Sequence, residues 1–120
     1  MYKLPKSGRL RRNKCFQAVY RSGKSYANRQ IVLYVLPQHG RERRVGFAAG
    51  KRLGNAVVRN RVKRLLREAY RLQQHNLKNG FDLIIVGRQT LVNETLPAVS
   101  AALSHLCDRA KILSSKGGAV

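Results

Sequence analysis

The chain has 120 residues, the length of one domain, and 43% of them are hydrophobic. This is enough for one modest core and excludes a wholly disordered chain. The 25 Lys and Arg residues against 5 Asp and Glu give a net charge of +20, which indicates a polyanionic partner, and nucleic acid fits best because neutralised phosphates release condensed counterions.

A membrane surface is the competing polyanion, but the sequence shows no means of entering one. No segment approaches the ~18 apolar residues of a transmembrane span. No apolar run follows the basic N-terminus, so we predict no secretory signal. We therefore expect a cytoplasmic protein with no membrane partner and no small-molecule substrate.

The basic charge is concentrated in the first part of the chain. Residues 1–71 contain 20 basic and 2 acidic side chains, whereas residues 72–120 contain 5 basic and 3 acidic ones. The RNA-facing surface should therefore come mostly from the first 71 residues. Residues 1–12 show no apolar period and are expected to form a basic arm, partly mobile without RNA, that carries Arg9, Arg11 and Arg12.

A short helix is predicted after the arm. Asn13 is suited to cap its N-terminus, and the helix should continue to about residue 21. Phe16 and Tyr20 fall four residues apart on one face. Cys15 and Val19 form a second pair, also four residues apart, on an adjoining face. We expect one pair to enter the core and the other to border a surface groove.

Strand-forming residues follow this helix. Residues 25–36 are rich in β-branched and aromatic side chains and are predicted as strand. Residues 37–42 are predicted as a loop and residues 43–49 as the returning antiparallel strand. Alternation in the returning strand predicts that one set of side chains faces the core, namely Val45, Phe47 and Ala49.

Two further helices and one strand complete the predicted fold. A helix from Val57 or Val58 to about Gln74 shows an apolar face, residues 82–87 read as a buried strand, and a last helix is predicted over 94–113. With an optional third strand before the basic helix, the order is taken as αβββαβα. It predicts an α+β protein, a single domain over residues 1–120 with the architecture of a two-layer α/β sandwich. The tail over 114–120 is expected to be mobile. Inward residues of the two helices should be Val58, Val62, Leu65, Leu66, Ala69, Val99, Leu103, Leu106 and Ala110.

The stretch 51–71 holds eight basic residues and one acid, Glu68. A solvated helix face usually mixes the two signs of charge, so this face is better suited to a polyanion. Arginine dominates, which suits bidentate phosphate contacts and stacking on bases. Gly54 and Asn55 precede the helix, whose free N–H groups can hold a phosphate directly.

Residues 54–68, with Arg-Asn-Arg at positions 59–61, resemble the signature of the protein subunit of bacterial ribonuclease P. The resemblance covers roughly residues 8–110, and its other matches are Arg9-Leu10, Phe16, Tyr20, Ala27-Asn28-Arg29-Gln30, Leu33-Tyr34, Arg44-Val45-Gly46-Phe47 and Lys51-Arg52. It implies a left-handed crossover from the third strand through the basic helix to the last strand. It also implies that an RNA subunit, which holds most of the Mg²⁺, catalyses removal of the 5′ leader of precursor tRNA.

The resemblance assigns two sets of contacts. The basic helix and its approach would bind the catalytic RNA subunit through Lys51, Arg52, Asn55, Arg59, Asn60, Arg61, Lys63, Arg64, Arg67 and Arg71. A groove between the first helix and the sheet would take the single-stranded leader through Phe16, Tyr20, Asn28, Arg29, Val32 and Tyr34. Tyr20 stands where the family often has Phe, and a phenol still stacks on a base. Without the resemblance, the aromatic pair would be read as core packing.

Catalysis by the protein itself is not expected. A two-metal nuclease needs clustered carboxylates, and the five acids are scattered along the chain. The three histidines fall on different predicted elements, and the distant Cys15 and Cys107 suggest reduced structural thiols. We therefore expect no catalytic and no metal-binding residue from the protein alone. A structural RNA-binding protein of the ribosomal type is the main alternative, and a DNA-binding helix-turn-helix is disfavoured because a strand, not a helix, precedes the basic helix.

Overall fold

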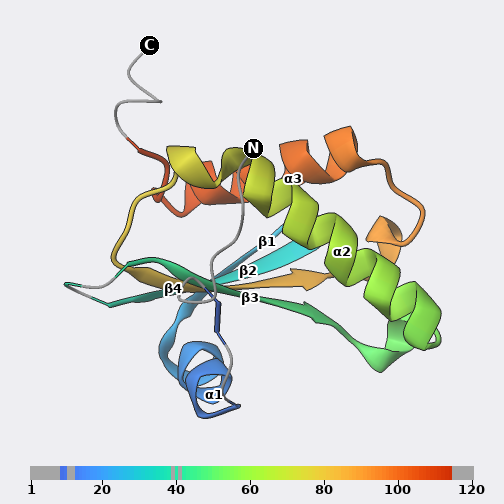
Figure 1. The fold of residues 1–120 in the computed structure, drawn as a ribbon, viewed down its shortest axis with the longest axis horizontal. Coiled ribbons are helices and arrows are strands. Elements are labelled where there is room, and N and C mark those ends of the chain that lie inside the picture. Colours follow the sequence, from blue (N-terminus) through green and yellow to red (C-terminus); the bar gives the residue numbers. More distant parts are fainter. Residues whose placement is uncertain (1–8, 11–12, 39, 41, 115–120) are drawn as a thin grey trace.

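The protein, described as a computed structural model over residues 9–10, 13–38, 40 and 42–114, is built around a four-stranded sheet (Figure 1). Two helices, α2 (Ala56–Gln73) and α3 (Leu96–Arg109), pack on each other and cover one face of the sheet. Helix α1 (Asn13–Ser22) lies against the opposite face. The predicted order αβββαβα and the α+β class are confirmed, with α1 as a partial layer outside the two-layer sandwich.

The sheet is mixed, with the strand order β1-β2-β4-β3. Its strands are β1 (Lys24–Ala27), β2 (Ile31–Pro37), β3 (Arg44–Ala49) and β4 (Phe81–Gly87). Strand β2 pairs antiparallel with both β1 and β4, whereas β3 pairs parallel with β4. The parallel pair is joined through α2, and the left-handedness of this crossover stays an implication of the family resemblance.

The segment predicted as strand over 25–36 is two strands joined by a tight turn. The side-chain Oδ1 of Asn28 accepts hydrogen bonds from the backbone N–H groups of Gln30, at 3.1 Å, and Ile31, at 2.9 Å. An Asn side chain that bonds to the backbone two and three residues ahead turns the chain without glycine or proline. This is why composition alone did not separate the two strands.

The predicted antiparallel pairing of the returning strand is wrong. Strand β3 runs opposite to β2, but β4 lies between them and pairs with both. The physical reason is the composition of β4, whose consecutive residues 82–85 are all buried and therefore need cover on both faces. A central position provides that cover, which leaves β3 at the edge.

Both long helices begin at side-chain caps. Asn55 Oδ1 accepts the backbone N–H of Val58 at 3.0 Å, and Thr95 Oγ1 accepts that of Ala98 at 3.4 Å. Helix α3 is shorter than predicted, because Lys111 adopts a left-handed conformation with φ of 60° just beyond its end.

The main core lies between the sheet and helices α2 and α3. It includes Leu33 and Ile85 from the sheet, Leu66 from α2 and Leu103 from α3, all fully buried. The inward orientation predicted for β3 is confirmed: Val45 is buried, and Phe47 and Ala49 pack against the same core. A second, smaller cluster under α1 contains Leu10, Val19 and Ile84. Helix α1 therefore covers only part of its face and leaves the rest of the sheet accessible.

Candidate RNA-binding surfaces

The entry to α2 has a defined backbone shape. Gly54 has a φ of 140°, a conformation that other residues rarely adopt, and a Cβ there would lie 3.2 Å from the Val58 side chain. The Asn55 cap uses the N–H of Val58, and the exposed Ala56 and Val57 begin the helix. The first-turn N–H groups therefore face solvent together with the positive end of the helix dipole.

The polar and basic side chains of α2 differ in their exposure to solvent and in the contacts they already make within the protein. Asn60, Arg61, Arg64 and Arg67 are exposed, whereas Arg59 and Lys63 are half-buried. Within the described residues, Arg64 makes no hydrogen bond or ion pair. Arg61 donates from Nη2 to the carbonyl of Val92 at 3.0 Å. The Arg67 guanidinium lies 5.9 Å from the centre of the Phe47 ring. The exposed members form a surface that can reach a polyanion without first breaking an ion pair.

Arg71 is the exception in the predicted set. Its Nε and Nη2 donate to the two carboxylate oxygens of Glu68 at 2.9 and 2.5 Å. This hydrogen bonding lowers the pKa of Glu68 and raises the pKa of Arg71, so both stay charged and paired. An RNA contact by Arg71 would share the guanidinium with a carboxylate.

On the other face of the sheet, aromatic side chains lie where the sequence predicts one wall of the leader groove, a name kept here for this region. The Tyr20 and Tyr34 rings meet edge to face, with centroids 4.9 Å apart at an interplanar angle of 81°. Tyr20 keeps 42% of its surface exposed, and burial raises its pKa further above neutrality, so it stays a neutral phenol. Phe16 lies over β3 at Gly46, where an added Cβ would come within 2.4 Å of the ring. Only glycine at position 46 lets α1 sit this close.

The floor of this groove is a row of small, half-buried apolar side chains. Val32 on β2 pairs in register with Val86 on β4, and Val86 pairs with Ala48 on β3. By strand alternation all three face the side of the sheet that carries α1, and Val86 and Ala48 pack against its cluster. The aromatic wall and this floor together offer an apolar surface for bases.

A basic rim lies at the far side of the floor. A pocket of about 620 Å³ is lined by Val86 together with four basic residues, Arg29, Lys51, Arg52 and Arg88. Arg88, which the sequence reasoning missed, directly follows β4. No local sequence signal marks it, because its place on the rim depends on the pairing of β4 with β2 beside the Asn28 turn.

Asn28, predicted to contact the leader, has its side chain engaged inside the protein. Besides the two turn hydrogen bonds, its Nδ2 donates to the carbonyl of Ala102 in α3 at 3.0 Å. Arg88 Nη1 in turn donates to the Asn28 carbonyl at 3.0 Å. Asn28 thus fixes the turn that carries Arg29, and a direct contact with the leader stays a prediction.

The start of the described chain connects the two surfaces. Arg9 forms a parallel bridge to Val45, and the N–H of Leu10 donates to the Val45 carbonyl at 2.9 Å. A pocket of about 200 Å³ there is shared by residues of the groove wall and of α2, namely Arg9, Leu10, Phe16, Val45, Gly46, Phe47, Lys63 and Arg67. The other predicted arm residues, Arg11 and Arg12, lie outside the described residues.

Within the part of the chain that the structure describes, no three His, Cys, Asp or Glu side chains are grouped as metal ligands. The buried carboxylate of Asp82 is ion-paired with Arg44, whose Nε and Nη2 donate to its two oxygens at 2.9 and 2.7 Å. Cys15 and Cys107 are both free thiols, and burial raises the pKa of Cys107 to about 12. The described helices include none that is long and apolar enough to cross a membrane.

Comparisons with known proteins agree on one family. The family model named Ribonuclease P matches residues 4–111. The ribonuclease P protein component of Brevibacillus brevis is 45% identical over 109 residues, which cover 90% of this chain and 86% of that protein. That of Symbiobacterium thermophilum is 43% identical over 115 residues, covering 95% of this chain and 100% of that protein.

Solved structures show the same likeness in three dimensions. The ribonuclease P protein of Staphylococcus aureus superposes with a TM-score of 0.80 at 34% identity, covering 91% of this chain and 100% of the other. The protein from Thermotoga maritima gives a TM-score of 0.76 at 28% identity, over 84% and 96% of the two chains. With a matching family model, close relatives and a shared fold, the chain belongs to the ribonuclease P protein components, RNA-binding proteins of tRNA processing that work in a ribonucleoprotein complex.

Proposed function

We propose that the protein holds the catalytic RNA of ribonuclease P with one surface and the 5′ leader of precursor tRNA with another. The observation that carries this proposal is the position of Lys51 and Arg52. They line the basic rim of the groove and stand five and four residues before the start of α2 at Ala56. One short segment thus joins the two surfaces, so the protein can contact both RNAs at once.

The α2 surface is suited to a folded RNA. Its exposed arginines can make bidentate phosphate contacts, and the first-turn N–H groups add a fixed partial charge beside them. Asn60 is exposed and offers both a donor and an acceptor, able to meet a base edge, a 2′-hydroxyl or a metal-bound water. We assign RNA-subunit binding to Lys51, Arg52, Asn55, Arg59, Asn60, Arg61, Lys63, Arg64 and Arg67, with a smaller contribution from the paired Arg71.

The groove is suited to a single strand of variable sequence. Bases stacked on aromatic rings gain ~1–3 kcal/mol each with little sequence preference. Phe16, Tyr20 and Tyr34 provide these rings, and the backbone phosphates of the same strand would reach Arg29 and Arg88 on the rim. Tolerance of sequence is what an enzyme acting on many different leaders requires.

The cleavage step itself is assigned to the RNA subunit. Mg²⁺, held mainly by RNA phosphates, would supply an activated water and stabilise the leaving oxygen. The contribution of this chain is to bind and orient: α2 fixes the RNA subunit, and the groove fixes the leader beside it. We place this activity in the cytoplasm.

A cleavage assay tests the proposal. The purified protein should leave precursor tRNA intact by itself, yet raise cleavage by the RNA subunit at low Mg²⁺. A structural RNA-binding protein of the ribosomal type would bind structured RNA without raising cleavage. Absence of stimulation would therefore refute the ribonuclease P role and favour that alternative.

A further inference from the structure

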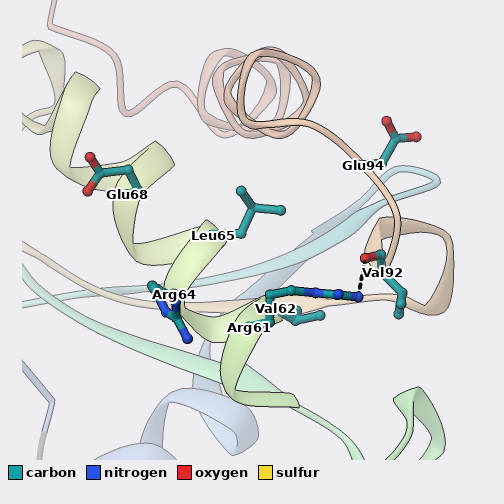
Figure 2. A pocket seen from close by; sticks show the side chains of 7 residues that line it. All are labelled: Arg61, Val62, Arg64, Leu65, Glu68, Val92 and Glu94. Atoms are coloured by element: carbon teal, nitrogen blue, oxygen red, sulfur yellow. Dashed lines mark hydrogen bonds between the residues drawn. The ribbon is translucent and has the colours of Figure 1, made fainter. Parts of the chain in front are cut away.

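A second pocket adjoins the α2 surface and is assigned no role by the proposed function. It has a volume of about 390 Å³ and lies between α2 and the segment that leads into α3 (Figure 2). Its size falls in the ~300–1,000 Å³ range of small-ligand sites. The lining residues are Arg61, Val62, Arg64, Leu65, Glu68, Val92 and Glu94.

The walls of this pocket are apolar, and a guanidinium crosses between them. Figure 2 shows Leu65 projecting from α2 toward the segment that carries Val92 and Glu94. Arg61 extends from α2 to the Val92 carbonyl, where the hydrogen bond of 3.0 Å fixes its end. A guanidinium held in this way is a flat surface on which a base can stack, and the side chains of Leu65 and Val92 add apolar contact area beside it.

The pocket also collects acids in a chain that has few. Two of the five carboxylates in this +20 protein, Glu68 and Glu94, line it. Glu68 is held by Arg71, but the hydrogen bond that Glu94 accepts from Gln30 Nε2 is long, at 3.5 Å. A carboxylate at the edge of an RNA-binding surface repels phosphate, so its natural RNA partner is a group that donates hydrogen bonds.

We propose that this pocket receives one unpaired base of the RNA bound to α2, with the donor edge of the base at Glu94. The flanking phosphates lie on Arg64 and on the first turn of α2. Guanine fits best, because its adjacent ring N–H and amino group can meet both oxygens of one carboxylate. Uracil fits least, because its single N–H lies between two carbonyl oxygens. The inference rests on the proposed function only in requiring that α2 faces RNA.

Methyl NMR spectra of the whole protein test this directly. The probes are two single-stranded RNA pentamers, UUGUU and UUUUU. Methyl groups of Leu65 and Val92 report on the pocket, and those of Val32 and Val86 report on the groove in the same spectra. We expect the guanine-containing pentamer to shift the pocket methyls with an affinity about fivefold or more above that of UUUUU, within the range expected for one good bidentate contact to a base.

A matched pair of variants isolates the carboxylate. Glu94→Gln should reduce the guanine preference to about twofold or less. Glu42→Gln removes the same charge from an exposed position outside the pocket and should leave the preference unchanged. Within the described residues, the Glu94 side chain makes only the long contact with Gln30, and Glu42 is exposed, so neither variant threatens the fold.

Two results would overturn the inference. One is a pocket whose methyls respond equally to both pentamers or not at all, as expected if it binds an apolar protein segment instead. The other is a guanine preference that survives Glu94→Gln. In either case, stimulation of the RNA subunit in the cleavage assay would show that the proposed function stands without this pocket. A protein that gave no stimulation but kept the preference would refute the proposed function alone.

Discussion

In the proposed function, the α2 surface and the groove would bind RNA by different physics. The α2 surface is made of charges on consecutive turns of one helix, so its binding should weaken steeply as salt rises. The groove combines aromatic rings from α1 and β2, a floor from three strands and a rim from three connecting segments. Stacking dominates there, and salt should matter less. The comparison teaches that one small domain can separate affinity for a particular RNA from tolerance of many leaders.

The largest expected effect is a loss of folding stability when the buried pair of Arg44 and Asp82 is broken. Arg44→Met would leave Asp82, which is 1% exposed, as a buried carboxylate without its partner, and should lower the free energy of unfolding by ~3–5 kcal/mol. Urea unfolding followed by circular dichroism measures this change. Arg71→Met, which breaks the half-buried surface pair of Arg71 with Glu68 on α2, should lower stability much less, because water still reaches this pair.

The double variant Arg44→Met with Asp82→Leu is the control for this effect. It removes both charges, so much of the lost stability should return. Equal unfolding midpoints for Arg44→Met and Arg71→Met would mean that the stability of the sheet does not depend on the buried pair of Arg44 and Asp82.

The next effect separates leader binding from tRNA binding. Tyr34→Ala removes a stacking ring and the partner of Tyr20, and should weaken holoenzyme binding of precursor tRNA by ~1–3 kcal/mol while mature tRNA is little affected. Filter binding at fixed salt gives both affinities. A precursor with an abasic leader should bind the variant and the native protein alike, and equal losses for precursor and mature tRNA would identify Tyr34 as core packing.

A smaller effect concerns the salt dependence of binding to the RNA subunit. Arg64→Ala should lower the slope of log affinity against log salt by at most ~1, because one phosphate contact is lost. Arg71→Ala is the matched comparison and should lower the slope less, since Glu68 already holds that guanidinium. A slope unchanged by Arg64→Ala would remove Arg64 from the phosphate contacts.

The smallest effect is a difference in thiol reactivity between the two faces of the sheet, which carry Cys15 in α1 and Cys107 in α3. Cys107 is buried in the main core, and with a pKa of about 12 only roughly one molecule in ten thousand carries the thiolate at pH 8. Cys15 in α1 is only half-buried. A thiol reagent at pH 8 should therefore modify Cys15 in the native protein and both residues after unfolding in urea. Fast native modification of Cys107 would contradict the burial assigned to α3.

The parts of the molecule that sequence could predict are those whose causes are local. The 3.6-residue period of α2 and the alternation of Val45 and Phe47 each depend on neighbouring residues. The exposed arginines of α2 follow from the same period. The two aromatic positions of α1 were also readable as a pair on one helix face.

What sequence could not predict depends on contacts between distant segments. The insertion of β4 between β2 and β3 is decided by burial of its two faces, which no short window reveals. Arg88 joins the rim only because that insertion brings the end of β4 beside the Asn28 turn. The engagement of Asn28 with α3, 74 residues away, has the same origin.

The short bridge between Arg9 and Val45 bears on self-association. Strand β3 is an edge strand, and an edge with free N–H and C=O groups invites pairing with a second molecule. The N–H of Leu10 occupies the Val45 carbonyl, and Arg9 brings a positive charge to the same edge. At the opposite edge, β1 has only four residues and begins with Lys24. The approach to α1 therefore occupies one position on the β3 edge and brings a positive charge beside it, which disfavours pairing of this edge with a second molecule.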